Sequence, residues 1–315
     1  MPRLLLTGAN GFVGKILTQR LRDAGYHVIA LSSSEPQPGH GADEHLGCDI
    51  RDAQALAQAV AQARPSHVVH LAAVSHVPTS FMDPLGTWQT NVMGSMHLLE
   101  AIRLHAPQAF VLFSSSSEVY GAAFKSGQAV DEHTLCQPLN PYAASKVAAE
   151  SAFAEYFRQG IKGVIARPFN HIGAQQSPDF VTASFARQIA LIEAGQQEPV
   201  LKVGNLEAAR DFLDVQDVCS AYIELLKLAD SDKDYPRRIN IASGRSLKIS
   251  QVLEQLLALS KADIQVAQDP ERLRPSDIPM AVGNSTALTQ STGWQPQIPL
   301  QQTLQELLDY WRAQV

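Results

Sequence analysis

Hydrophobic positions in the first part of the chain fall into short apolar runs separated by helical patterns. The apolar runs, which predict buried strands, lie at 3–8, 27–32, 67–73 and 109–117. Helical spacing begins at Val13 and is found again at 51–63 and 88–104. Strands and helices in strict alternation predict βαβ units, and therefore an α/β fold with a doubly wound parallel sheet.

The pattern changes after residue 168, where the sequence becomes rich in turn-forming residues. Further helices are predicted at 180–194, 250–260 and 300–313. The run "RRINIAS" at 237–243 predicts one more strand of the first sheet. We therefore expect one domain of residues 1–168 plus about 210–245, and a smaller mixed domain of 169–209 and 246–315.

Three glycines, Gly8, Gly11 and Gly14, form a GxxGxxG motif where the first strand meets the first helix. Glycine allows a tight turn there, a close approach of the backbone to a pyrophosphate, and packing of the helix on the sheet. The helix N-terminus adds hydrogen-bond donors and a partial positive charge. Glycines at such a junction are often only turn chemistry, but the position after an N-terminal strand favours a dinucleotide site.

Other positions fit the same site. Asp49 follows the expected third strand, where its carboxylate would accept a hydrogen bond from an adenine amino group, and Leu71, Ala72 and Ala73 would bring small or apolar side chains against the dinucleotide. An ordinary loop acid and a packed strand end are the alternatives. The second strand ends at Ser32 in a run of serines instead of the acid that binds the ribose of NAD. This favours NADP(H), with NAD(H) possible.

Tyr142 and Lys146 in "YAASK" lie four residues apart, hence on one face of a helix. A nearby ammonium favours the phenolate, so the tyrosine exchanges its proton more easily. A serine from "SSSSEVYG" (114–121), at the end of a strand, would hold a substrate oxygen. The YxxxK pattern alone is common by chance, but its distance from the glycines and the serines favours a catalytic site.

Taken together, "TGANGFVG", "CDI", "HLAA", "TNVMGS", "SSSSEVYG" and "PYAASK" resemble the extended short-chain dehydrogenase/reductase family. The resemblance implies a Rossmann-type NAD(P)-binding domain followed by a nucleotide-sugar-binding domain. It implies that Ser116 is the catalytic hydroxyl and Tyr142 the general acid/base, with Lys146 tuning the tyrosine and binding the nicotinamide ribose. The further cofactor-binding residues that it implies are Phe12, Val13, Ile50 and Asn91.

The second half is similar to the members of this family that act on GDP-mannose derivatives, through "FNHIGAQQSPDF", "RDFLDVQDV" and "LRPSDIP". The resemblance implies reduction of GDP-4-dehydro-6-deoxy-D-mannose to GDP-D-rhamnose. The candidate substrate-binding residues are Ser75, Ser116, Glu118, Asn170, Arg187, Lys202, Arg210 and Arg274. The planar guanidinium suits phosphate oxygens, so Arg210 and Arg274 are the preferred contacts, whereas Arg187 and Lys202 fit a solvated surface equally well.

Other functions stay open. GDP-mannose 4,6-dehydratases combine a Thr or Ser, a Glu two residues later and the Tyr/Lys pair, and Ser116 and Glu118 reproduce that spacing. "SHVPTSF" is also dehydratase-like, but the chain lacks their "RDWGHAKDY" string and the arginine-rich loop after "FNH". GDP-fucose synthases carry a cysteine at the position of Glu118. A non-catalytic nucleotide-sensing protein would commonly lose the tyrosine or lysine.

The net charge of −6 is spread thinly, without a basic stripe, which gives no case for nucleic acid or a membrane surface. Three scattered cysteines favour a reducing, cytoplasmic compartment. No second ligand lies at metal-binding distance from His171, so no metal is expected. The family resemblance implies a homodimer formed through the helices at 88–104 and 142–157.

Overall fold

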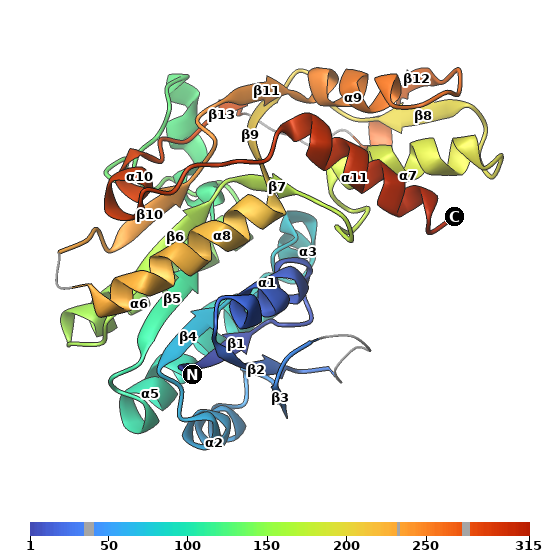
Figure 1. Ribbon diagram of the computed structural model, residues 1–315. Coiled ribbons are helices and arrows are strands. Elements are labelled where there is room, and N and C mark those ends of the chain that lie inside the picture. Colours follow the sequence, from blue (N-terminus) through green and yellow to red (C-terminus); the bar gives the residue numbers. More distant parts are fainter. Residues whose placement is uncertain (35–40, 232–233, 273–277) are drawn as a thin grey trace.

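The computed structural model describes residues 1–34, 41–231, 234–272 and 278–315. A seven-stranded parallel sheet, in the order β10-β6-β5-β4-β1-β2-β3, forms the centre of its larger part (Figure 1). The strands are β1 Arg3–Thr7, β2 His27–Ser32, β3 Glu44–Gly47, β4 His67–His70, β5 Phe110–Ser114, β6 Gly163–Pro168 and β10 Arg238–Ile241. The strand predicted from "RRINIAS" is β10, which pairs with β6. The predicted doubly wound α/β fold is confirmed.

Helices cover both faces of this sheet. On one face α1 (Phe12–Asp23) and α8 (Val215–Leu226) lie side by side, as Figure 1 shows. The other face carries α2 Ala53–Ala63, α5 Gly94–His105 and α6 Pro141–Arg158. Side chains alternate across a strand, so Leu4 and Leu6 of β1 pack toward α1 and α8, while Leu5 packs toward α2 and α5. Both faces are therefore buried, as a parallel sheet requires.

The single helix predicted over 88–104 is divided in the structure. α4 (Pro84–Trp88) runs into a π-helical turn, η1 (Gln89–Met93), before α5 begins at Gly94. A π-helical turn inside a helix inserts one extra residue, and such turns are frequent at functional sites. It places Asn91 in the interior beside the cleft described below, where its side chain is 2% exposed.

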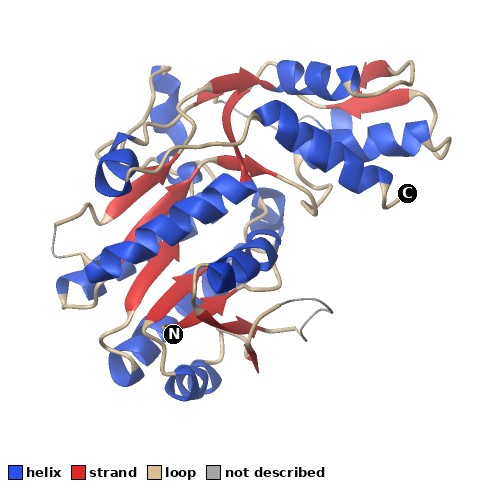
Figure 2. Ribbon diagram, in the orientation of Figure 1, coloured by secondary structure: helices blue, strands red, loops and turns tan. Residues whose placement is uncertain are grey.

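A smaller lobe stands beside the sheet, at the upper right in Figure 2. Its helices and strands are α7 Val181–Glu193, β8 Val200–Val203, α9 Ile249–Ala258, β12 Gln265–Gln268 and α11 Leu300–Arg312. Its own apolar core joins α7, α9 and α11. These are the three helices predicted for the second half. The domain boundaries stay a prediction.

Short elements connect the two parts. A four-stranded sheet has the order β11-β9-β13, with β7 paired to β9. Its strands are β7 Asn170–Ile172, β9 Ala209–Asp214, β11 Ser246–Lys248 and β13 Met280–Ala281. The remaining helices are α3 Val77–Met82, η2 Ser117–Ser126, η3 Lys227–Asp230, η4 Pro270–Arg272 and α10 Thr286–Thr292. Of these, β7 and η2 border the cleft between the sheet and the lobe.

Candidate active site

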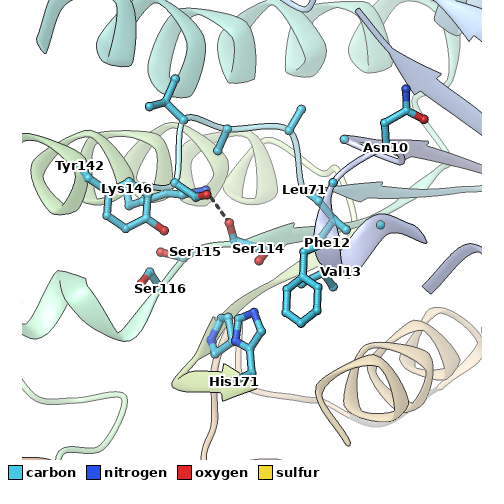
Figure 3. Close-up of a pocket in the computed structure, with 18 of the residues that line it drawn as sticks. Asn10, Phe12, Val13, Leu71, Ser114, Ser115, Ser116, Tyr142, Lys146 and His171 are labelled. Atoms are coloured by element: carbon cyan, nitrogen blue, oxygen red, sulfur yellow. Dashed lines mark hydrogen bonds between the residues drawn. The ribbon is translucent and has the colours of Figure 1, made fainter. Parts of the chain in front are cut away.

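A cleft of about 750 Å³ opens at the carboxyl ends of the central strands. Its walls come from the β1–α1 turn, from the ends of β4 and β5, from α6 and from β7. β1 and β4 are neighbours in the sheet, and the strand order reverses between them. This is the switch point at which doubly wound sheets bind ligands. Figure 3 shows the side chains that project into the cleft.

The β1–α1 turn is shaped for close approach to a phosphate. Gly8 has φ +73°, and a Cβ there would lie 2.7 Å from the amide nitrogen of Ala72. A Cβ on Gly14 would lie 2.3 Å from the Gly8 carbonyl oxygen. Gly11 is the N-cap of α1, and with Phe12 and Val13 it lines the cleft. A helix N-terminus that opens at a glycine-rich turn fits a dinucleotide pyrophosphate.

The far end of the cleft is lined by Ser32, Asp49 and Ile50. The Ser32 hydroxyl accepts a hydrogen bond from the side-chain amide of Asn10 at 3.0 Å. The two carboxylate oxygens of Asp49 accept from the Arg51 guanidinium, with an Nη2–Oδ2 distance of 2.6 Å. This hydrogen bonding lowers the pKa of Asp49. Arg51, which the sequence analysis did not single out, therefore brings a cation to the nucleotide end of the cleft.

Leu71, Ala72 and Ala73 line the cleft directly after β4. Asn91 holds this segment from behind, because its Oδ1 accepts from the Val74 amide at 2.8 Å and its Nδ2 donates to the Val74 carbonyl at 3.0 Å. Its Nδ2 also lies 2.9 Å from the hydroxyl oxygen of Ser145 on α6. The side chain predicted to bind the cofactor is thus placed where it joins the β4 loop to the helix of Tyr142.

Tyr142 and Lys146 lie one turn apart on α6, and Figure 3 shows both pointing toward the end of β5. The Lys146 Nζ donates to the carbonyl of Ser114 at 2.8 Å and lies 4.9 Å from the centre of the Phe113 ring. Burial lowers the pKa of Lys146 to about 8. The ammonium is therefore charged at neutral pH but close to losing its proton, as proton chemistry near pH 7 requires.

The Tyr142 ring is buried beside Ser116. Burial raises the pKa of Tyr142 to about 12, with the hydrogen bond to Ser116 acting in the opposite direction and the charge of Glu118 adding to the rise. The Ser116 oxygen accepts from the Glu118 amide at 3.1 Å, which leaves its own proton available to donate. Two protonated hydroxyls therefore face the same point of the cleft.

Glu118 lies in the first turn of η2 and lines the cleft. Its Oε2 accepts from the side-chain amide of Asn140 at 3.0 Å. Asn140 is also the N-cap of α6, where its Oδ1 accepts from the Ala143 amide at 2.7 Å. One asparagine therefore caps the helix that carries Tyr142 and holds the carboxylate beside it.

The predicted substrate-binding residues are spread over the molecule. Ser75 and Asn170 line the cleft together with Ser116 and Glu118. Arg187 is exposed on α7, with its guanidinium 5.9 Å from the centre of the Trp311 ring, and Lys202 is exposed on β8. Neither is part of the cleft lining. Arg274 lies outside the described residues.

Arg210 lies on β9, half-buried, and donates to the carbonyls of Ala209 at 2.8 Å and Ile278 at 3.2 Å. Burial lowers its pKa, and the charge of Glu118 opposes that effect. His171, considered above as a metal ligand and set aside, stacks on Phe12 with ring centres 6.1 Å apart. Its Nδ1 donates to the Phe169 carbonyl at 3.0 Å.

Neither a metal-binding group of side chains nor a helix able to span a membrane is found in the described part of the chain. In those residues no three or more His, Cys, Asp or Glu side chains are grouped so that they could hold a metal ion. None of the helices described there is both long and apolar enough to cross a bilayer.

The polar side chains behind the catalytic wall, which is formed by Ser114–Ser116, Tyr142 and Lys146, were not predicted from the sequence. Glu150, Arg167 and Tyr222 are each 3% exposed or less. The hydroxyl of Tyr222 on α8 forms a hydrogen bond with the Ser114 hydroxyl, with 2.8 Å between the two oxygens. Glu150 had one detectable signal, because it follows Lys146 by four residues and so lies on the same face of α6. Arg167 and Tyr222 come from distant segments, which helical spacing does not connect.

The parallel sheet, the glycine turn at its switch point and the Tyr142–Lys146 pair define an extended short-chain dehydrogenase/reductase. The chain matches the family described as GDP-mannose 4,6 dehydratase over residues 5–307, and it belongs to that family.

Two enzymes illustrate the range of its relatives. It is 37% identical to GDP-6-deoxy-D-mannose reductase of Pseudomonas aeruginosa, over 99% of this chain and 98% of the relative. It is 28% identical to GDP-mannose 4,6-dehydratase of Vibrio cholerae, over 96% and 92% of the two chains. Among solved structures, that of RMD from Pseudomonas aeruginosa complexed with NADPH has a TM-score of 0.87 at 35% identity, covering 100% of both chains.

Proposed function

We propose that this protein reduces the C4 keto group of GDP-4-dehydro-6-deoxy-D-mannose and forms GDP-D-rhamnose. The observation that carries the proposal is the meeting of Ser116, Tyr142 and Lys146 at one point of a cleft whose other end fits a dinucleotide. The identity of 37% to a GDP-6-deoxy-D-mannose reductase, against 28% to a dehydratase, supports the choice of substrate and reaction.

A bound nicotinamide dinucleotide would supply the hydride. Gly8, Gly11 and Gly14 would accommodate its pyrophosphate, and Ser116 would donate a hydrogen bond to the keto oxygen of the sugar. Tyr142, protonated at neutral pH because burial raises its pKa to about 12, would transfer its proton to the forming alkoxide. The Lys146 ammonium would stabilise the phenolate left behind. The chain thus contributes positioning and one proton, the usual share of the protein in such a reaction.

The alternative is a GDP-mannose 4,6-dehydratase, favoured by one specific observation: Glu118 is held beside Tyr142 by Asn140. Such an enzyme would convert GDP-mannose alone into keto-sugar, without net consumption of cofactor. We therefore suggest following nicotinamide absorbance and sugar products in two incubations, one with GDP-mannose and one with the keto-sugar plus NADPH. A reductase consumes NADPH only in the second, and keto-sugar formed in the first would contradict the proposal.

The proposed cofactor is NADPH, with NADH tolerated. Two features support it: the end of β2 offers the Ser32 hydroxyl in place of an acid, and Arg51 lies at the same end of the cleft. A guanidinium matches the oxygens of a 2′-phosphate. Arg51→Ala should then raise the KM for NADPH more than that for NADH. An equal change for both cofactors would assign Arg51 only to its ion pair with Asp49.

We further propose a homodimer, formed in the cytoplasm. Large apolar side chains are exposed on adjoining elements packed against α6, among them Met82 (77%) on α3, Leu85 (76%) on α4 and Met93 (50%) on η1. A group of this kind marks an interface more often than single exposed side chains do. The free thiols of the three cysteines suit a reducing compartment.

Sedimentation of the purified protein tests the dimer. Leu85→Asp should shift it to a monomer, whereas Leu135→Asp, at a side chain 73% exposed outside these helices, should leave the dimer intact. A monomeric wild-type protein would contradict the dimer without touching the proposed reaction.

A further inference from the structure

A buried ion pair lies directly behind the catalytic wall and has no role in the reaction proposed above. Glu150 and Arg167 are joined by two hydrogen bonds, Nε to Oε1 at 2.8 Å and Nη2 to Oε2 at 2.6 Å. Their side chains are 4% and 3% exposed. Taking two charges out of water is costly, and a buried ion pair often stabilises a fold no better than apolar side chains would. Its presence therefore needs a reason other than stability.

The pair is bonded to the catalytic segment. Ser115 donates its hydroxyl to Glu150 Oε1 at 2.6 Å. Its two neighbours carry the chemistry, because the carbonyl of Ser114 accepts from Lys146 and the hydroxyl of Ser116 bonds Tyr142. A carboxylate that holds Ser115 in position therefore also restricts the positions of Ser114 and Ser116.

A second set of contacts holds the arginine. Arg167 donates from Nη1 to the Tyr120 hydroxyl at 3.0 Å, and its guanidinium lies 4.9 Å from the centre of the same ring. Tyr120 in turn donates to Asn240 Oδ1 at 2.7 Å on β10. The carboxylate of Glu150 is thus oriented by residues from β6, η2 and β10, and has little freedom to move.

We propose that Glu150 is a positioning residue of the reaction: its fixed negative charge keeps Lys146 protonated, and its bond to Ser115 sets the path of the Ser114–Ser116 segment. Glu150 and Lys146 lie one helical turn apart on α6, and the charge of Glu150 acts on the ammonium inside the protein, where charges are screened less than in water.

The charges around the Glu150–Arg167 ion pair determine in which direction Glu150 changes the pKa of Lys146. The titratable and charged groups around the ion pair come from several elements and are His70 of β4, Glu118 and Tyr120 of η2, Glu132 and Cys136 between η2 and α6, Tyr142 of α6, Tyr222 of α8 and Arg238 of β10. Burial lowers the pKa of His70 to about 3 and raises that of Tyr222, so both are neutral near pH 7. The charge of Glu118 raises the pKa of Tyr142.

Glu150 is therefore the carboxylate that counters the effect of burial on Lys146. Removing its charge lowers the pKa of Lys146. It also lowers the pKa of Tyr142, since a nearby negative charge disfavours the phenolate. The proposed reaction needs both Tyr142 and Lys146 protonated, so both changes move the alkaline limb of activity to lower pH.

The experiment compares Glu150→Gln with Glu155→Gln, the same change on the exposed side of the same helix. In Glu150→Gln the alkaline limb of the kcat/KM profile should move down by about one pH unit or more, whereas Glu155→Gln should keep the wild-type profile. An unmoved limb in folded Glu150→Gln overturns the proposal.

Glu150→Gln leaves Arg167 buried without its partner, so the double variant Glu150→Gln/Arg167→Met removes both charges. It should fold more stably than Glu150→Gln and move the limb in the same direction but by less, because the loss of the Arg167 charge opposes the loss of the Glu150 charge. Ser115→Ala keeps the charge, so it should lower kcat while leaving the limb in place. If both Glu150 variants fail to fold and Ser115→Ala is fully active, Glu150 serves only the fold and the proposal is wrong.

The pH–rate readout rests on the proposed function, so a second readout needs no substrate. NMR titration of protein labelled at lysine Cε, with the Lys146 signal assigned by its loss in Lys146→Arg, should show a lower pKa in Glu150→Gln than in wild type. If the Lys146 pKa is lower in Glu150→Gln than in wild type, but the wild-type protein oxidises no NADPH, the proposed reductase activity is wrong and the effect of Glu150 on Lys146 is still supported. An unchanged Lys146 titration refutes the inference alone.

Discussion

The two walls of the cleft hold their polar side chains in different ways. On the sheet side, Tyr142 and Lys146 are 7% and 3% exposed, and Lys146 has a defined hydrogen-bond partner. On the lobe side, the basic side chains predicted to bind the substrate are either exposed, as Arg187 and Lys202 are, or bonded to backbone carbonyls, as Arg210 is. The side chains proposed for the chemistry are therefore held in place within the cleft, whereas these basic side chains proposed for recognition lie outside its lining.

This difference predicts a separation of kinetic effects. Changes in the sheet wall should lower kcat, because groups that are already in place act mainly in the transition state. A change at a lobe side chain that binds the substrate should instead raise KM, because such a side chain would contact parts of the substrate far from the reacting carbon. Each of the following variants can support or break that separation.

The largest effect is expected for Tyr142→Phe. Loss of the only proposed proton donor should lower kcat by about 10³-fold, with NADPH affinity close to that of wild type. Absorbance assays and NADPH fluorescence titration measure the two quantities, and Tyr310→Phe on α11 is the matched control. If cofactor binding disappears together with turnover, Tyr142 is a structural residue.

Gly14→Ala should act on the cofactor and on stability. The new Cβ would lie 2.3 Å from the Gly8 carbonyl oxygen, so the β1–α1 turn has to move. We expect a loss of roughly 1–3 kcal/mol in the free energy of unfolding and a clear rise in the Kd for NADPH. Denaturant unfolding and fluorescence titration measure both. Gly47→Ala, where no atom lies within 4 Å of the added Cβ, should change neither, and equal losses in the two variants would contradict the role of the turn.

Arg210→Ala should affect the KM for the substrate more than substitutions at the other basic residues of the lobe do. None of Arg210, Arg187 and Lys202 is part of the cleft lining, but Arg210 interacts with the charge of Glu118, which is. We expect Arg210→Ala to raise the KM for the GDP-keto-sugar about tenfold, equivalent to about 1.4 kcal/mol, with kcat little changed. Arg187→Ala and Lys202→Ala should keep the wild-type KM. The reverse order of effects would show that the substrate binds outside the described cleft.

The smallest effect is expected for Glu118→Gln, at the boundary between the two walls. The amide keeps a hydrogen-bonding side chain next to Asn140, and reduction needs no base at this position. Steady-state assays should therefore show that most of the reductase activity remains. A loss as large as that of Tyr142→Phe would place Glu118 in the chemistry and favour the dehydratase.

The sequence predicted the part of the site that depends on local spacing. Gly8, Gly11 and Gly14 lie at the strand–helix junction, and Tyr142 and Lys146 share one face of α6. These relations come from the period of a strand or a helix, so they can be read within a few residues. The sheet strand from "RRINIAS" was found because buried parallel strands are continuous apolar runs.

Relations between distant segments were not predictable in this way. The strand expected to reach 117 ends at Ser114, because Ser116 caps η2 through its bond to the Glu118 amide. The helix over 88–104 is divided by η1, and the ion pair of Glu150 joins α6 to β6. α8, which places Tyr222 beside Ser114, was not predicted. Such features depend on tertiary contacts that a single sequence does not encode locally.

The central claim is that a hydride reaches C4 of a GDP-linked keto-sugar at the Ser116–Tyr142–Lys146 centre. The most direct test supplies NADPH with both hydrogens at C4 of the nicotinamide replaced by deuterium, together with GDP-4-dehydro-6-deoxy-D-mannose, and analyses the product by mass spectrometry and NMR. One deuterium at C4 of the sugar is predicted for the wild-type protein, and none for Tyr142→Phe over the same time. A product without deuterium, or keto-sugar made from GDP-mannose with no loss of NADPH, would contradict the account.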